Sequence, residues 1–273
     1  MPSPAAAPGQ GRIRVERSGG RSVVTRAYAT SPLRLLTPAN HGSAAWIYTS
    51  SYGGGLVDGD AIDIDVTVGP GAAAFVSTQA STKVYRSPCG TATGVRGRVG
   101  RGALLVVAPD PVVPFTGARY RQVQRFDIAG DGALVVTDAL SSGRRAFGER
   151  WAFSEYYGLI EVFIDGRRLV YDAMALRAAD GDLAARLGRF DALVVAIVAG
   201  GPLGPDAARL VAGASALPVA RGADPFVTTS PLGADGCIVR IAAGSMERAV
   251  RSLRALLAFV PDRLGEDPWT RKW

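Results

Sequence analysis

The amino-acid sequence predicts a mainly β, single-domain protein with two α-helices in its C-terminal third. Apolar and polar side chains alternate over residues 61–68 (AIDIDVTV), a pattern typical of a strand with one buried face. Turn signals recur about every ten residues through the first two-thirds of the chain, which favours a continuous body of strands. No internal repeat of fixed period is visible in the sequence, which argues against a regular solenoid or propeller.

Further strand patterns follow in the first two-thirds, and one pair of strands forms a clear hairpin. The single strand patterns cover residues 102–107 (GALLVV), 120–128 (YRQVQRFDI) and 132–139 (GALVVTDA). In LIEVFIDGRRLVYD, residues 159–172, the pair Asp165-Gly166 lies between two apolar strands and accepts positive φ at both turn positions. We therefore expect two antiparallel strands that are joined at this pair.

The last third of the chain adds helical patterns to apolar strands. Strands are expected over 192–199 and 236–243, and a short helix over 180–188. Residues 204–214 (GPDAARLVAGA) carry a proline and an aspartate in the first turn, where both are favourable in a helix. Ser245 can cap a second helix, whose apolar residues recur at three- and four-residue steps until Pro261 ends it.

Composition and cysteine usage indicate a cytoplasmic globular protein. The chain has 273 residues, of which 48% are hydrophobic, so a disordered protein is excluded. No apolar run is long enough to span a bilayer, and the N-terminus lacks the apolar segment of a secretory signal. We expect a flexible tail over 1–12 and one domain over 13–273. Cys89 and Cys237 lie far apart in the sequence, and this spacing fits neither a disulfide framework nor a zinc motif. A reducing compartment is therefore favoured.

The net charge of +7 is carried almost wholly by arginine, because Lys83 and Lys272 are the only lysines. A basic balance suggests an acidic partner. The arginines are scattered over expected loops, strands and a helix and are not interleaved with aromatic residues, so nucleic-acid binding is not expected. His41 is the sole histidine, which excludes a metal site built from several histidines.

The glycine-rich segment SYGGGLVDGD, residues 51–60, raises the question of a ligand loop. It lacks the lysine of a phosphate-binding P-loop, and it leads into a strand where a dinucleotide site would open a helix. The closing glutamate of a calcium loop is also absent. A structural turn at Asp58-Gly59 is the plainer interpretation. Tyr52, Asp58 and Asp60 next to bare backbone leave open the approach of an ion or another chain.

Residues 141–158 (SSGRRAFGERWAFSEYYG) form the densest polar and aromatic stretch of the sequence. Arginine and aromatic side chains are favoured anchors of protein interfaces, so this segment is a candidate partner surface. The alternative is a strand with ordinary cross-strand ion pairs. Together with part of 81–90 (STKVYRSPCG), the candidate contact residues are Arg144, Arg145, Arg150, Trp151, Tyr85 and Arg86. Motifs of hydrolases and metalloproteases are absent, so the chain looks more like a scaffold than an enzyme.

Taken together, these stretches resemble one family, the urease accessory protein UreD, also called UreH. The resemblance is collinear and covers nearly the whole chain. The motifs that carry it are SYGGGLVDGDAIDIDV, FVSTQASTKVYRS, LLVVAPDPVVPFTGARYRQ, SSGRRAFGERWAF, FIDGRRLVYDAMAL, GASALPVARG and DPWTRKW. The resemblance implies an irregular helical stack of β-strands, similar to a β-helix, with two helices.

The resemblance also implies a cytoplasmic, non-enzymatic chaperone of nickel insertion. Such a chaperone would bind the urease apoprotein and the accessory protein UreF, and through UreF it would recruit the GTPase UreG. GTP would then be bound only by UreG, nickel would be in transit, and this chain would hold no tightly bound cofactor. Neither nucleic acid nor a membrane is an expected partner.

The candidate nickel contacts are Asp60 and Glu149, which lie in the two strongest motifs, with Asp58 as a further candidate. Nickel favours imidazole but accepts carboxylates, and oxygen ligands suit a passage that must release its cargo. The alternative is that these acids hold turns and pair with Arg86 or Arg144. Two other functions stay open: a metal- or phosphate-dependent enzyme that uses the loop 58–60, and a β-rich binding module.

Overall fold

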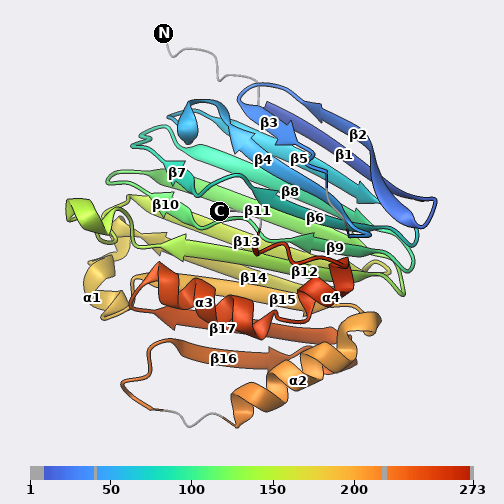
Figure 1. Ribbon diagram of the computed structural model, residues 1–273. Coiled ribbons are helices and arrows are strands. Elements are labelled where there is room, and N and C mark those ends of the chain that lie inside the picture. The colour runs from blue at the N-terminus through green and yellow to red at the C-terminus, as the bar shows by residue number, and fades with distance from the viewer. Residues whose placement is uncertain (1–8, 40–41, 217–219, 271–273) are drawn as a thin grey trace.

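Two β-sheets face each other in the computed structural model, which describes residues 9–39, 42–216 and 220–270 (Figure 1). In spatial order, sheet A consists of β14 (Arg167–Arg177), β13 (Glu155–Ile164), β11 (Arg119–Ile128), β8 (Thr91–Val99), β5 (Ala61–Val68), β1 (Gly9–Ser18) and β2 (Arg21–Ala29). Sheet B consists of β16 (Phe226–Pro231), β17 (Gly236–Ala243), β15 (Ala192–Ala199), β12 (Ala133–Ser141), β9 (Leu104–Val107), β6 (Ala73–Thr78), β4 (Ala45–Ser51) and β3 (Leu33–Leu36). The short strands β7 (Thr82–Val84) and β10 (Val112–Pro114) pair with each other, and β10 joins sheet B by pairing with β12.

Between β4 and β13 the chain passes repeatedly from one sheet to the other. β4, β6, β9 and β12 are parallel neighbours in sheet B. β5, β8, β11 and β13, which alternate with them along the chain, are parallel neighbours in sheet A. Each return to the same sheet therefore adds one turn to a helical stack. The expected mainly β fold with helically stacked strands is confirmed.

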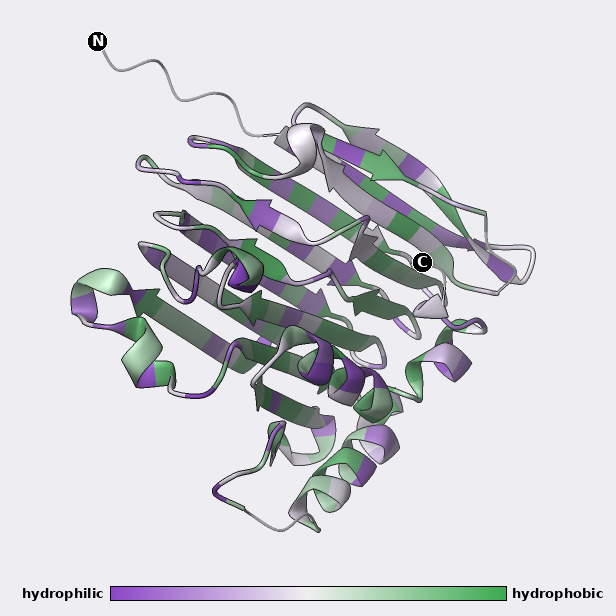
Figure 2. Ribbon diagram, turned by 60° about the vertical axis from the view of Figure 1, so that its left-hand side comes forward, coloured by the Kyte–Doolittle hydropathy of each residue, from purple (hydrophilic) through white to green (hydrophobic). Residues whose placement is uncertain are grey.

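The space between the sheets is filled by side chains that stay in register from strand to strand. Val66 aligns with Gly97, Gly97 with Phe126, and Phe126 with Val162. A Cβ at Gly97 would lie 2.4 Å from the Phe126 ring, so glycine makes room for that ring. The alternation predicted over 61–68 is confirmed, because every second residue there is buried. Figure 2 shows such alternating bands along the strands farthest from the helices.

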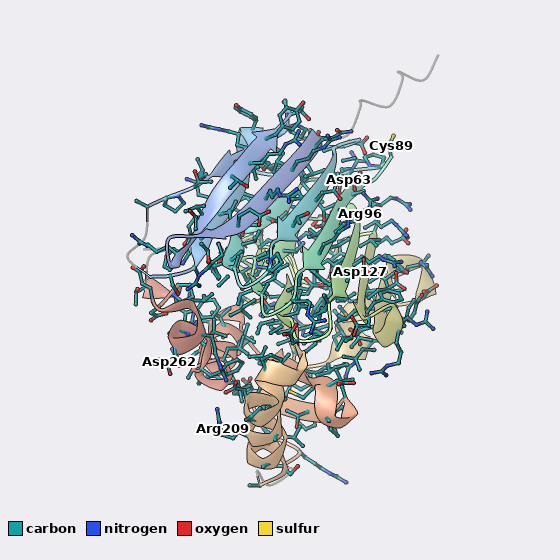
Figure 3. All side chains as sticks on the ribbon, turned by 90° about the vertical axis from the view of Figure 1, so that its right-hand side faces the viewer. Asp63, Cys89, Arg96, Asp127, Arg209 and Asp262 are labelled. Atoms are coloured by element: carbon teal, nitrogen blue, oxygen red, sulfur yellow. The ribbon has the colours of Figure 1, made fainter. Side chains whose placement is uncertain are left out.

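The outer face of sheet A carries charged side chains. Asp63, Arg96 and Asp127 lie on the neighbouring strands β5, β8 and β11, and Figure 3 shows them along this face. Asp65 pairs with Arg96 at 4.0 Å, and both side chains are largely exposed. Period-two alternation thus gives this sheet one apolar face and one polar face, as expected for strands that are half buried.

Three helices cover the outer face of sheet B: α2 (Gly204–Ser215), α3 (Met246–Leu256) and α4 (Val260–Leu264) (Figure 1). Between the helices and the sheet lies a second apolar cluster, which includes Trp46, Phe75 and Leu257. β12 is buried at every position, because one of its faces meets the space between the sheets and the other meets this cluster.

The two main helices of the C-terminal third are confirmed, with one difference in their ends. The Ser245 hydroxyl caps α3 by accepting a 3.3 Å hydrogen bond from the Arg248 N–H, as predicted. The prediction that this helix continues to Pro261 is wrong. Instead α3 ends at Leu256, and Pro261 lies in the first turn of α4, where its missing N–H is not needed. The short helix expected over 180–188 is α1 (Leu183–Leu187).

The hairpin is confirmed: β13 and β14 are antiparallel, and Asp165 and Gly166 join them with φ values of 48° and 77°. Residues 1–8 of the expected tail lie outside the described residues. For residues 9–12 the tail prediction is wrong, because they begin β1, which pairs in parallel with β5. Within the described ranges, no helix has both the length and the apolar character needed to cross a membrane.

Candidate functional site

The glycine-rich loop is a structural turn, and both of its aspartates are engaged in it. Asp60 Oδ2 accepts a 2.8 Å hydrogen bond from the Val57 N–H, which closes the turn. Asp58 Oδ1 accepts hydrogen bonds from the N–H groups of Cys89 (2.8 Å) and Gly90 (3.1 Å), which ties the loop to the segment before β8. In the described part of the chain, no group of three or more His, Cys, Asp or Glu side chains could hold a metal ion. His41 lies outside that part.

Glycine is required in this loop by a close backbone approach. A Cβ at Gly55 would lie 2.7 Å from both the Lys83 carbonyl oxygen and the Tyr85 ring. The next residue, Leu56, forms a parallel bridge with Val84. The segment therefore docks against β7, and the absence of a side chain at Gly55 serves packing between two segments of this chain.

Glu149 is engaged on a different loop, by Arg144. Arg144 Nε lies 2.9 Å from Glu149 Oε2, and Arg144 Nη2 donates to Oε1, so the ion pair is two-pronged. The Thr116 N–H adds a 3.4 Å hydrogen bond to Oε2. These donors hold the pKa of Glu149 below its ordinary value. Asp58 and Asp60 thus hold turns, and Glu149 pairs with Arg144, the arrangement that the alternative described.

Two of the expected partner contacts, Tyr85 and Arg144, come together on an aromatic stack. The Arg144 guanidinium lies over the Phe115 ring at 4.0 Å and over the Phe147 ring at 5.0 Å. Tyr85 meets Phe115 edge to face, with 5.1 Å between the ring centroids. Arg86 lies beside this stack, because its side chain packs over Gly117.

The remaining predicted contacts bind the 141–158 segment to its own chain. Asp191 pairs with Arg145 at 3.0 Å and with Arg150 at 2.5 Å, and Arg150 also donates to the carbonyls of Gly188 and Phe190. Trp151 is 3% exposed and donates a 2.9 Å hydrogen bond from Nε1 to the Phe190 carbonyl. The prediction that Trp151 contacts a partner at the surface is therefore wrong, because its ring is part of the core.

The interior between the sheets contains a cavity of about 160 Å³ with mainly apolar walls and a group of polar side chains on one side. Tyr120, Gln122 and Gln124 line it from β11, and Thr93 lines it from β8. Gln124 is 2% exposed, and its Nε2 has no hydrogen-bond partner among the described residues. An unpartnered buried amide beside hydroxyl and amide groups is a position where water can bind.

A second cavity, of about 480 Å³, lies near the other end of the stack. Its polar walls are Asp138 on β12, Tyr156 on β13, Asp172 on β14, and Thr228 and Arg240 on β16 and β17. Asp172 and Arg240 form an ion pair across it. Because β14 belongs to sheet A and β17 to sheet B, this ion pair bridges the two sheets at the end of the stack.

A cluster of hydrogen-bonded side chains, which we call the partition, lies between the two cavities. The Tyr120 hydroxyl lies 2.6 Å from Thr93 Oγ1 and donates a 2.9 Å hydrogen bond to Gln122 Oε1 on the side of the smaller cavity. On the other side, the Tyr156 hydroxyl donates a 2.8 Å hydrogen bond to Asp138 Oδ2. The two tyrosine rings are 6.1 Å apart, and Gln122 also hydrogen-bonds Asp138. Polar groups are thus continuous from one cavity to the other.

Comparison with known proteins explains the order of the sequence motifs. The family model described as UreD urease accessory protein matches residues 7–273. This chain belongs to the UreD family. It is 48% identical to the urease accessory protein UreD of Sorangium cellulosum, over 97% of this chain and 84% of that protein. It is 46% identical to UreD of Anaeromyxobacter sp., over 96% and 89%, and 39% identical to urease accessory protein D of Arabidopsis thaliana, over 71% and 68%.

The buried acid of this UreD family member has an altered acidity. Burial raises the pKa of Asp138, while the hydrogen bonds from Tyr156 and Gln122 oppose part of that rise. Burial also raises the pKa values of Tyr120 and Tyr156, so both hydroxyls stay protonated and can donate. The partition is therefore built from neutral donors around one carboxyl group whose charge is costly.

The sequence analysis missed these interior residues of the UreD chain, although a signal was present. In YRQVQRFDI, Tyr120, Gln122 and Gln124 occupy the same face as Phe126 and are buried with it. Asp138 likewise interrupts the apolar run of β12. A polar residue on the buried face of a strand pattern needs a partner inside, and that requirement could have identified the site.

Proposed function

We propose that this chain is a non-enzymatic scaffold of urease maturation and that nickel crosses its interior on the way to urease. In this proposal the chain binds the urease apoprotein and UreF, and UreG joins through UreF. The observation that carries the nickel route is the pair of cavities, each with polar side chains in its walls, between which the Tyr120–Gln122–Asp138–Tyr156 partition lies. GTP would be bound by UreG, which agrees with the lack of a P-loop in the sequence.

The chemistry of the walls suits a divalent cation in transit. Carboxylate, amide and hydroxyl oxygens can each replace a water molecule around nickel without forming the tight cage that imidazole and thiolate ligands build. Asp138 and Asp172 are the acids that line the larger cavity, and Asp110 lines the smaller one. Asp58 and Asp60 are not part of the proposed route, because one oxygen of each accepts backbone hydrogen bonds in the turn and neither side chain lines the two cavities.

The alternative of an enzyme at the loop 58–60 is less well supported. A catalytic carboxylate needs a free oxygen within reach of a substrate. Asp58 and Asp60 each hold the turn with one oxygen, lie among exposed and half-exposed residues, and line neither of the two cavities described above. We therefore retain the scaffold with an interior route as the function that the geometry supports best.

The test is nickel loading of urease in a mixture of purified apo-urease, UreF, UreG, GTP and nickel. The double variant D138N/D172N removes both acids from the larger cavity with little change in volume. We expect urease to receive severalfold less nickel, measured by mass spectrometry of the metal, while the variant still co-elutes with UreF and apo-urease. The matched control D63N/D127N removes two acids from the outer face of sheet A and should load urease normally (Figure 3).

Full nickel loading by a folded D138N/D172N variant would refute the interior route. Failure of the wild-type chain to co-elute with either protein would refute the scaffold itself. The two parts of the proposal therefore have separate readouts.

A further inference from the structure

The loop between β12 and β13 projects from the body of the protein and is braced at its base (Figure 1, yellow-green, at the left). The two-pronged ion pair of Arg144 with Glu149 closes this loop. The Glu149 N–H also donates a 3.2 Å hydrogen bond to the Arg144 carbonyl, and Gly148 turns the chain with a φ of 76°. Residues 145–147 form a 3-10 turn, and the ion pair of Arg144 with Glu149 fixes both of its ends.

A second brace ties the loop to the segment before β15. Asp191 forms ion pairs with both Arg145 and Arg150. The Ser142 N–H donates a 2.8 Å hydrogen bond to the Asp191 carbonyl. The buried Trp151 follows directly. With both ends fixed, the tip of the loop presents its side chains with little conformational entropy left to lose on binding.

The tip presents one large apolar side chain to solvent. Phe147 is 75% exposed, more than any other large hydrophobic side chain in the described residues. Its ring rests on Arg144, which in turn rests on Phe115, with Tyr85 edge-on behind. An exposed aromatic ring on a rigid support matches the anchors that dominate protein interfaces.

Two more exposed apolar side chains lie on the glycine-rich loop. Tyr52 and Val57 are more than half exposed and flank Gly55, whose backbone packs on Tyr85. Among the residues that the structure describes, six large hydrophobic side chains are exposed, and these two and Phe147 lie on the connected loops 52–57 and 143–150.

The charges around the stack are positive. Glu149 and Asp191 are already paired with Arg144, Arg145 and Arg150. Lys83 and Arg86, which flank Tyr85, form no ion pair with any residue in the described ranges. A partner that complements this surface would carry carboxylates opposite them.

We propose that Phe147 is the anchor by which this chain docks onto a protein partner that offers an apolar pocket rimmed by carboxylates. The inference rests on the proposed function, in which UreF and apo-urease are the proteins that this chain binds. It adds the residue that inserts, the rigid support beneath it and the charge of the surface that receives it. Lys83 and Arg86 steer the encounter, and Phe147 supplies the buried contact.

The test measures binding of F147A to UreF and to apo-urease separately, by surface-immobilised binding kinetics. We expect one of the two affinities to fall about 10- to 30-fold, mainly through faster dissociation. Tyr171, which is 57% exposed on β14 and belongs to none of these loops, supplies the matched control Y171A. Its affinity should equal that of the wild type. The charge reversal K83E/R86E should slow association, and the effect should shrink as salt is added.

Because Phe147 is exposed, F147A should keep the wild-type unfolding midpoint, which separates lost binding from lost folding. Unchanged binding of F147A to both proteins, with wild-type binding intact, would overturn the anchor and leave the scaffold standing. Wild-type self-association in sedimentation that F147A abolishes, with binding to both proteins unchanged, would overturn the stated partner in favour of a second copy of this chain. Absence of wild-type binding to either protein would instead refute the proposed function.

Discussion

The Tyr156 hydroxyl donates a 2.8 Å hydrogen bond to Asp138 Oδ2, and this contact joins the two sheets inside the stack. The two residues lie on consecutive strands, β13 and β12, which belong to different sheets. Both are buried, and both line the larger cavity. The stability of the interior is therefore linked to the protonation of one carboxyl group.

We first predict that D138N stabilises the protein at neutral pH. Burial raises the pKa of Asp138, so the folded state binds a proton that the unfolded state has released above a pKa of about 3.9. Stability from this group is present below that pH and is lost as the pH rises through the folded pKa. Asparagine does not titrate and keeps an acceptor for Tyr156.

The measurement is urea unfolding of wild type and D138N between pH 4 and pH 8. The free-energy difference in favour of D138N should grow with pH and then become constant. A tenfold change in proton affinity corresponds to about 1.4 kcal/mol. A difference that shrinks as the pH rises would contradict the raised pKa.

The second prediction concerns the donor of the same hydrogen bond. Y156F should destabilise the protein by about 1–3 kcal/mol, because it leaves a buried carboxyl group without one of its donors. The neighbouring Tyr157 faces outward beneath Arg121, so Y157F is a matched control with little expected effect. In a double-mutant cycle, Y156F and D138N should be non-additive. Strict additivity would indicate that the two side chains do not interact in solution.

Local patterns in the sequence were sufficient for the strands and turns, but not for their stacking. Alternation over 61–68 and the pair Asp165-Gly166 depend on neighbours in the chain, and both were confirmed. The helical stack depends on parallel pairing between strands that lie about 30 residues apart, such as β5 with β8, and periodicity carries no information on that pairing. The helical stack was predicted only from the resemblance to the UreD family.

The candidate site likewise combines contacts between residues close in sequence with contacts that depend on strand pairing. Glu149 and Arg144 lie five residues apart, so their pairing was within reach of the sequence. The interior partition needs Tyr120, Asp138 and Tyr156 from three different strands, and only the register brings them together. Trp151 was expected at the surface because aromatic residues anchor interfaces, but composition cannot distinguish an exposed ring from a buried one.

The third prediction concerns the buried acid between the helices. Asp206 is 1% exposed on α2 and pairs with Arg209 and, at 2.7 Å, with Arg263 on α4. D206A should cost about 2 kcal/mol in urea unfolding, below the usual effect of breaking a buried pair, because both arginines can regain water. R251A removes an exposed ion pair with Glu247 and should cost about 0.5 kcal/mol or less.

Similar losses in D206A and R251A would show that the acid does not hold the two helices together. A loss in D206A that R263A reproduces would assign the effect to the contact between α2 and α4. The variants are compared by their urea midpoints, provided that the dependence of the unfolding free energy on urea is the same as in the wild type. A changed dependence would indicate a changed unfolded state.

The last prediction compares two glycines on the single strand β8. At Gly97 a methyl group would meet the buried Phe126 ring at 2.4 Å, whereas at Gly94 it would meet the end of the Asp63 side chain on the outer face. G97A should therefore cost about 1–3 kcal/mol, and F126L should relieve part of that cost by removing the ring. G94A should be neutral or slightly stabilising, because Asp63 can turn away and alanine restricts the unfolded chain. Equal urea midpoints for G97A and G94A would mean that the ring can also shift, and that the register through Gly97 is looser than the packing indicates.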